Sequence, residues 1–193
     1  LHVITCTKYQ TPSQSNASLL FILNSFFNNK IHTDWKSRYE VFENIVSSVQ
    51  VEDDSSDYTD EKLKRYIELN TENSDFVGWI KIDGTHINYP VMKNSTPDYY
   101  LHRNFNKEYS YYGTPYLSEK SDTMKPTDNI VIYGHNMRDN TMFGDLSKYK
   151  SKEFFEKHRY IHFDTLVDLG KYEVVCVFKT TSNKFIGRIK DSI

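Results

Sequence analysis

After Asp75 the sequence becomes a series of short β-strand patterns separated by turn residues, and this series most narrows the possible folds. The first two patterns, residues 76–82 and 85–91, flank Asp83-Gly84, a pair that favours a two-residue hairpin turn. Further elements are predicted as strands at 114–117, 130–133, 160–163 and 172–178 and as short helical turns at 141–149 and 152–157. Strands this short and numerous are typical of a sheet or barrel.

Two helices are predicted before the strands. Apolar side chains recur three and four positions apart over residues 34–49, and the acidic, serine-containing stretch 52–57 ends this pattern. A second helix follows, with Tyr66 on its apolar face. We therefore expect an α+β protein with helices in residues 31–72 and a β-barrel domain in residues 73–193.

Residues 1–30 differ in composition from the rest and are expected to form an N-terminal extension. Their apolar run, residues 17–23, is roughly half of the about 20 residues that a membrane span needs. Three interpretations stay open for this run: the remnant of a membrane anchor, a short signal-like core, or a helix packed on the domain. Residues 14–17 are also typical of the scar left by tag cleavage, so residues 1–17 need not be native.

Charge and cysteine content exclude several classes of function. The chain has 24 Lys and Arg against 26 Asp and Glu, and its net charge of −2 gives no basic field for a nucleic-acid partner. The two cysteines, Cys6 and Cys176, are too few for a disulfide framework or a Cys-rich zinc site. Because Cys176 lies within an apolar strand pattern, we expect it to be buried and structural.

The C-terminal end is unusual for a barrel. Residues 180–193 follow the last predicted strand and show no clear strand pattern. A sheet that ends with that strand would have an unpaired edge, which favours aggregation. We therefore expect strands that are missing here or supplied from elsewhere.

His135 is the clearest candidate in the sequence for a side chain that takes part in chemistry. It follows the β-branched strand 130–133 within Gly134-His135-Asn136, where a strand opens into a loop. A side chain there is held by a rigid scaffold and is still reachable by a substrate. Histidine titrates near neutral pH and can donate or accept a proton, so His135 is the candidate catalytic residue.

A second histidine pair, His158 and His162, has the four-residue spacing of helical metal ligands. Residues 160–163 alternate like a strand, however, which would place the two imidazoles about 13 Å apart on one face. No carboxylate stands between them as in helical zinc-hydrolase motifs. We predict no metal site.

Several separated motifs occur in the order found in class B sortases, the surface cysteine transpeptidases of Gram-positive bacteria. Residues 73–85 resemble the opening strand pair of that family, and Ile87-Asn88-Tyr89-Pro90-Val91 resembles its second strand. Asp98-Tyr99-Tyr100-Leu101 is similar to the segment that follows. Tyr133-Gly134-His135-Asn136-Met137, with residues 141–146, resembles the histidine motif. The resemblance extends from about Val41 to Phe178.

This resemblance implies a sortase-type β-barrel and a three-group mechanism. A cysteine thiolate attacks the Thr carbonyl of a sorting-signal peptide, a histidine protonates the leaving amine, and an arginine steadies the developing oxyanion. An amino group of peptidoglycan then resolves the acyl-enzyme. His135 matches the catalytic histidine, and Tyr133 and Leu101 match positions that line the peptide groove. The resemblance further implies no cofactor, an N-terminal membrane anchor and a place on the extracellular face of the cell membrane.

The catalytic cysteine of the family has no matching residue after His135 in this sequence. In the family a Thr-Leu-x-Thr-Cys strand and an arginine strand follow the histidine, but the 58 residues after His135 contain no such motif. Cys176 lies too early, and Arg188 has no nucleophile strand before it. Val3-Ile4-Thr5-Cys6 loosely matches the motif at the opposite end, so Cys6 is either the nucleophile of a permuted chain or an incidental cysteine.

Two functional hypotheses therefore stay open. One is a sortase whose C-terminal strands were lost by truncation or frameshift. The other is an inactive fragment or a module that binds a sorting-signal-like peptide without cleaving it.

Overall fold

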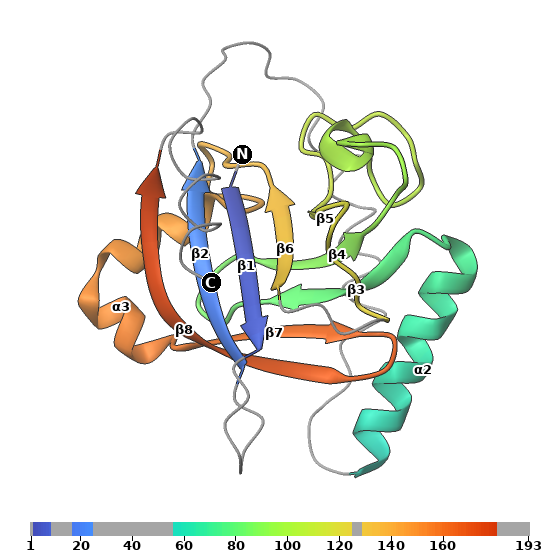
Figure 1. Cartoon of the computed structure of the whole chain (residues 1–193), viewed down its shortest axis with the longest axis horizontal. Coiled ribbons are helices and arrows are strands. Elements are labelled where there is room, and N and C mark those ends of the chain that lie inside the picture. Colours follow the sequence, from blue (N-terminus) through green and yellow to red (C-terminus); the bar gives the residue numbers. More distant parts are fainter. Residues whose placement is uncertain (1, 9–16, 25–55, 125–128, 181–193) are drawn as a thin grey trace.

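The computed structural model describes residues 2–8, 17–24, 56–124 and 129–180, and it describes side chains within 61–124 and 129–177 (Figure 1). The helix α2 (Ser56–Glu72) confirms the second predicted helix. The predicted helix over residues 34–49 lies outside the described residues. A short 3₁₀ helix, η1 (Tyr99–His102), lies between β4 and β5. A second 3₁₀ helix, η2 (Gly144–Lys150), leads into α3 (Lys152–Lys157).

Six strands form a curled mixed sheet, which confirms the α+β class and the strand positions predicted from the sequence. Along the sheet they run in the order β8, β7, β3, β4, β5 and β6. Their bounds are β3 (Phe76–Lys81), β4 (Asn88–Met92), β5 (Tyr116–Leu117), β6 (Asn129–Gly134), β7 (Tyr160–Thr165) and β8 (Leu169–Thr180). Of these neighbours, only β4 and β5 run parallel.

Two further strands close this sheet into a barrel. β1 (His2–Lys8) pairs antiparallel with β6, and β2 (Ala17–Asn24) pairs antiparallel with β1 and parallel with β8 (Figure 1). The edge beyond β8 is therefore paired, and of the two alternatives, missing strands or strands supplied from elsewhere, the second is the one observed: β1 and β2, within residues 1–30, occupy the gap between β6 and β8. The apolar run that begins at Ala17 is extended, and in the described part of the chain no helix is long and apolar enough to cross a bilayer.

The hairpin between β3 and β4 has a longer loop than the sequence predicts. Ile82 N donates to Ile87 O at 2.9 Å and closes a four-residue loop, where a two-residue turn was expected. Thr85 explains the difference: its hydroxyl donates to Ile82 O at 2.7 Å and accepts from Ile87 N at 3.0 Å. These two bonds satisfy backbone groups that a tight turn would pair directly.

Side chains form two apolar cores, one inside the barrel and one on its outer side. The inner core includes Ile80, Ile132, Phe143 and Phe163, none of which is exposed to solvent. The outer core consists of Tyr66, Leu69, Phe76, Trp79, Met92, Tyr100, Phe105 and Tyr116. It joins α2 and η1 to the outer faces of the strands, so the segment that carries η1 is fixed to the barrel wall.

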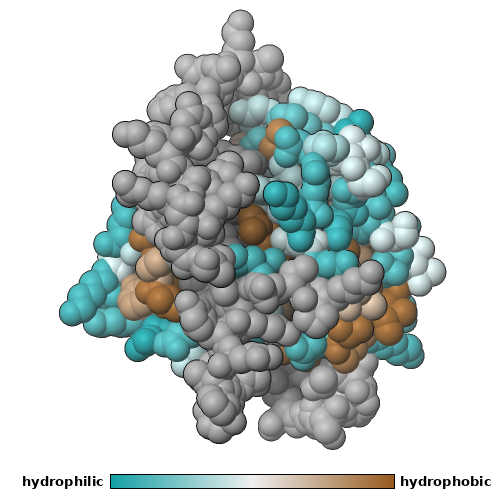
Figure 2. All heavy atoms as spheres, viewed as in Figure 1, coloured by the Kyte–Doolittle hydropathy of each residue, from teal (hydrophilic) through white to brown (hydrophobic). Residues whose placement is uncertain are grey.

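A buried polar contact fastens α2 to the sheet. Tyr66 Oη donates to Asp164 Oδ2 at 3.0 Å, and Lys62 Nζ lies 2.7 Å from the same oxygen. The Tyr66 ring also stacks on Trp79. On the face in Figure 2, apolar surface gathers where α2 lies beside the β7–β8 hairpin, and exposed Ile67 and Val167 belong to these elements.

Candidate active site

His135 is the first residue after β6, and the backbone on both sides of it is fixed. Alternate residues of β6 point into the barrel, so Ile132 and Gly134 are buried and His135 lies on the outer side. The chain then folds back, and Phe143 N donates to His135 O at 2.9 Å. The Phe143 ring packs on Gly134, where a Cβ atom would come within 2.7 Å of it. Glycine is therefore needed just before His135.

The imidazole of His135 is oriented by a backbone carbonyl. Its Nε2 lies 2.8 Å from Leu101 O. Because a carbonyl oxygen only accepts, Nε2 carries the proton in the neutral ring and Nδ1 holds the lone pair. Nδ1 makes no hydrogen bond to the residues whose side chains are described. His135 therefore presents one free, basic nitrogen on the outer side of the barrel.

The pKa of His135 lies below the usual value for histidine. Burial is the main cause because it disfavours the charged ring, and the nearby His102 adds to the effect. The hydrogen bond to the Leu101 carbonyl acts in the opposite direction but does not reverse the shift. At neutral pH the ring is therefore more fully deprotonated than an exposed histidine.

The carbonyl of Leu101 is itself held in place by η1 and the chain after it. Leu101 N donates to Asp98 O at 2.9 Å, and Thr114 N donates to Tyr100 O at 3.0 Å. Gly113, with φ of +61°, passes so close that a Cβ atom there would lie 2.3 Å from Leu101 O. A side chain at position 113 would therefore displace the acceptor that orients His135.

Below η1, Asp75 collects three hydrogen-bond donors. Its Oδ2 accepts from Asn94 Nδ2 at 2.8 Å and Tyr100 Oη at 2.9 Å, and Lys107 Nζ lies 3.3 Å away. Burial alone would raise the pKa of Asp75, but these donors outweigh it and lower the pKa. The ionised carboxylate thus anchors Tyr100 and, through it, η1.

Asp75→Asn is expected to lower the free energy of unfolding by about 1–2 kcal/mol at pH 7, because it removes the charge that these donors share. A carboxyl with a lowered pKa stabilises the fold above its ordinary pKa and loses that contribution as pH falls through the lowered value. The difference between the two proteins should therefore shrink below about pH 4. Urea unfolding at several pH values measures this. Asp83→Asn, which removes only an exposed ion pair with Lys81, is the control and should change little.

Leu101 and Tyr133, the predicted groove residues, lie on the two elements that meet at His135. Both side chains are half-buried and pack against the outer core. Tyr133 contacts the ring of Tyr116 at 5.5 Å, and Tyr116 Oη donates to Asp98 Oδ1 at 2.5 Å. The structure thus brings Leu101 to His135 and places Tyr133 two residues before it in β6. Their role in binding substrate stays a prediction.

Neither cysteine lies beside His135. In β1, Cys6 is paired with Ile130, whereas His2 is paired with Gly134. His135 is five residues beyond Ile130, which corresponds to roughly 16 Å along an extended strand. Cys176 lies in β8, separated from β6 by β2 and β1. Arg188 lies outside the described residues.

The prediction that Cys176 is buried is wrong: it is exposed. Leu19 of β2 pairs with Val174, but Leu20 pairs with Cys176, so Val175 is the extra residue of a β-bulge. A bulge shifts the alternation of side chains, which turns both Val175 and Cys176 outward. The burial that remains raises the pKa of the thiol, and no residue among those described here lowers it.

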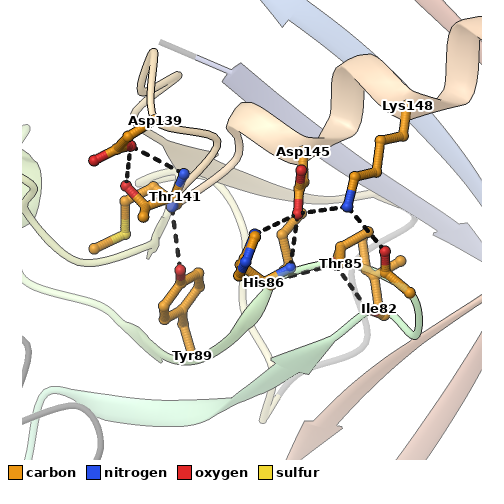
Figure 3. A network of polar contacts seen from close by, with 11 residues as sticks. Ile82, Thr85, His86, Tyr89, Asp139, Thr141, Asp145 and Lys148 are labelled. Carbon is orange, nitrogen blue, oxygen red and sulfur yellow. Dashed lines mark hydrogen bonds and ion pairs between the residues drawn. The ribbon is translucent and has the colours of Figure 1, made fainter.

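A second polar network lies at the β3–β4 loop and also involves a histidine (Figure 3). The buried Asp145 of η2 accepts from His86 N at 2.8 Å and lies 2.8 Å from His86 Nδ1. Lys148 Nζ lies 3.1 Å from the same carboxylate and donates to Gly84 O. This network joins η2 to the loop. Within the described residues, no three His, Cys, Asp or Glu side chains are grouped to hold a metal.

The family model described as Sortase domain matches residues 80–191 of this chain. Two proteins named Sortase B are similar to this chain. The one from Listeria monocytogenes is 30% identical over 162 residues, covering 79% of this chain and 66% of the relative. The one from Staphylococcus aureus is 37% identical over 114 residues, covering 59% and 47%. The chain thus spans about two thirds and about half of these relatives.

A solved structure is similar as well. It is the Staphylococcus aureus sortase B–substrate complex, which matches with a TM-score of 0.58 and 29% identity over 70% of this chain and 62% of the other.

Proposed function

This chain belongs to the sortase family, in its class B, and from that premise we propose that it is a cysteine transpeptidase that joins surface proteins to peptidoglycan. The observation that carries the proposal is the geometry of His135. A half-buried imidazole at the end of β6 is fixed through Nε2 by Leu101 O, and its Nδ1 makes no hydrogen bond to the residues whose side chains are described. An oriented titratable group of this kind is suited to general acid–base catalysis.

In the proposed reaction, a cysteine thiolate attacks the carbonyl carbon of a Thr residue in a sorting-signal peptide. The tetrahedral intermediate collapses to a thioester, the C–N bond breaks, and the leaving amine takes a proton from Nδ1 of the His135 imidazolium. An amino group of peptidoglycan then attacks the thioester, loses its proton to the neutral ring and forms an amide. This step releases the thiolate and restores the imidazolium.

The peptide is proposed to lie along Leu101 and Tyr133. These two half-buried side chains stand on η1 and β6, the two elements that meet at His135. The cell envelope of a Gram-positive bacterium is where sortases act. We propose that this protein works on the extracellular face of the membrane, held there by an N-terminal anchor.

The proposed reaction needs a cysteine beside His135, and the pairing of β1 with β6 does not put one there. The chain has two cysteines. Cys6 lies in the strand that pairs directly with β6, but toward the end of that strand remote from His135. This register favours a second candidate function, a module that binds the peptide in the groove of Leu101 and Tyr133 without cleaving it.

A cleavage assay distinguishes the two functions. Its substrate is a pool of fluorescence-quenched peptides, each with one Thr followed by a variable residue. The transpeptidase is expected to cleave the pool and to transfer the acyl group to added hydroxylamine, an amine that captures thioesters. Cys6→Ser and Cys176→Ser then identify the nucleophile, because only one of them should abolish transfer. Saturable binding of the peptides without cleavage would support the binding module, and neither binding nor cleavage would refute both.

A further inference from the structure

A second histidine lies against the ring of His135. The centroid of the His102 ring is 5.2 Å from that of His135, and the two planes are inclined by 40°. His102 is the last residue of η1, directly after Leu101, whose carbonyl binds Nε2 of His135. Two consecutive residues thus contact the imidazole, one at a ring nitrogen and the other with its own ring.

The turn after η1 holds His102 in this position. Ser110 N donates to His102 O at 2.9 Å, and Arg103 forms a β-bridge with Tyr109. The Tyr109 ring stacks on His102 with centroids 6.2 Å apart and planes 22° from parallel. The buried Asn104 closes the turn by accepting from Glu108 N at 3.0 Å. The result is a row of three rings: His135, His102 and Tyr109.

Charge on His102 acts directly on His135. With ring centroids 5.2 Å apart, a positive charge on His102 repels a positive charge on His135. Tyr109 on the turn and Tyr133 in β6 place phenol rings on this side of the barrel. The loop after β6 carries Arg138 and Asp139, whereas Leu101 contributes only its carbonyl. The lowered pKa of His135, caused first by burial and then by His102, agrees with this geometry.

We propose that His102 is a positioning residue for His135: its ring, stacked on Tyr109, fixes the orientation of the imidazole, and its charge controls how readily the imidazole takes up a proton. The consequence for catalysis rests on the proposed function, in which His135 must be protonated to release the amine. The contact between the two rings does not depend on it.

A charge series at position 102 tests the proposal without substrate. Histidine ring resonances of the whole chain are followed by NMR as pH is changed, and the resonance of His135 is assigned by its loss in His135→Gln. In His102→Gln, which has no charge, the midpoint of the His135 titration is expected to rise. In His102→Lys, which is charged throughout the range, it is expected to fall below that of the unsubstituted protein.

Identical midpoints in all three proteins would overturn the proposal, and so would a His102→Lys midpoint above that of His102→Gln. His86→Gln is the matched control, because His86 is bound to Asp145 in the other network and should leave the midpoint of His135 unchanged. If the protein cleaves peptides, the pH profile of kcat should move in the same order. An ordered series without turnover would refute the transpeptidase and leave the coupling of the two histidines standing.

Discussion

His135→Ala is expected to reduce the rate of peptide cleavage by about 10²–10⁴-fold, the usual contribution of a positioned acid or base. The amine that leaves the tetrahedral intermediate is a poor leaving group until it is protonated. His135 is bound through Nε2 to the carbonyl of Leu101, and within the described side chains its Nδ1 has no hydrogen-bond partner and is available for proton transfer. Steady-state kinetics with the peptide pool measure the loss, which should appear in kcat rather than in KM.

Leu101 and the groove should be almost unaffected by this substitution, so the affinity for peptide serves as an internal check. His158→Ala removes another half-buried imidazole, packed on Phe154. This control should keep nearly full activity. A His135→Ala protein that cleaves peptide within threefold of the unsubstituted rate would show that another group delivers the proton.

Local periodicity was enough to predict most of the elements. The strands around Ile80, Ile132 and Phe163 and the helix around Tyr66 each have a regular apolar pattern over their own length, and all four are confirmed. Such patterns work because an element that buries one face must repeat its apolar residues with its own period.

The errors come from contacts that no local pattern contains. The loop of the first hairpin depends on the hydroxyl of Thr85, and the exposure of Cys176 depends on a bulge opposite Leu20 in β2. The apolar run from Ala17 was ambiguous for a different reason. A short apolar run fits a helix, an anchor or a buried strand equally well. Only its pairing with β1 and β8 in the folded chain identifies it as a strand.

In the candidate site, too, residues in a local sequence pattern could be predicted, and a residue that depends on contacts in the folded chain could not. His135 could be predicted because glycine and a β-branched strand precede it, and Leu101 because it stands in a recognisable motif. His102 was missed although it follows Leu101 directly. The role proposed for it depends on the stack with Tyr109, seven residues away along a turn whose hydrogen bonds form only in the folded chain.

Phe143→Ala is expected to lower the free energy of unfolding by about 3–5 kcal/mol, a large part of the 5–15 kcal/mol typical of a domain. Phe143 is fully buried in the inner core, so its loss would leave a cavity behind β6. Its ring also lies against Gly134, and its backbone N–H binds His135 O. Urea unfolding followed by tryptophan fluorescence and circular dichroism measures the change.

Phe143→Leu removes the aromatic ring but keeps an apolar side chain that refills part of the cavity, so it should cost clearly less stability than Phe143→Ala. Phe155→Ala is the matched control for a phenylalanine that is only half-buried and should cost much less than Phe143→Ala. The pH titration of His135 adds a second readout in Phe143→Ala protein that remains folded. Because Phe143 supports the residue just before His135, that titration should broaden or shift. A stability within 1 kcal/mol of the unsubstituted protein would contradict the packing of this ring behind the site.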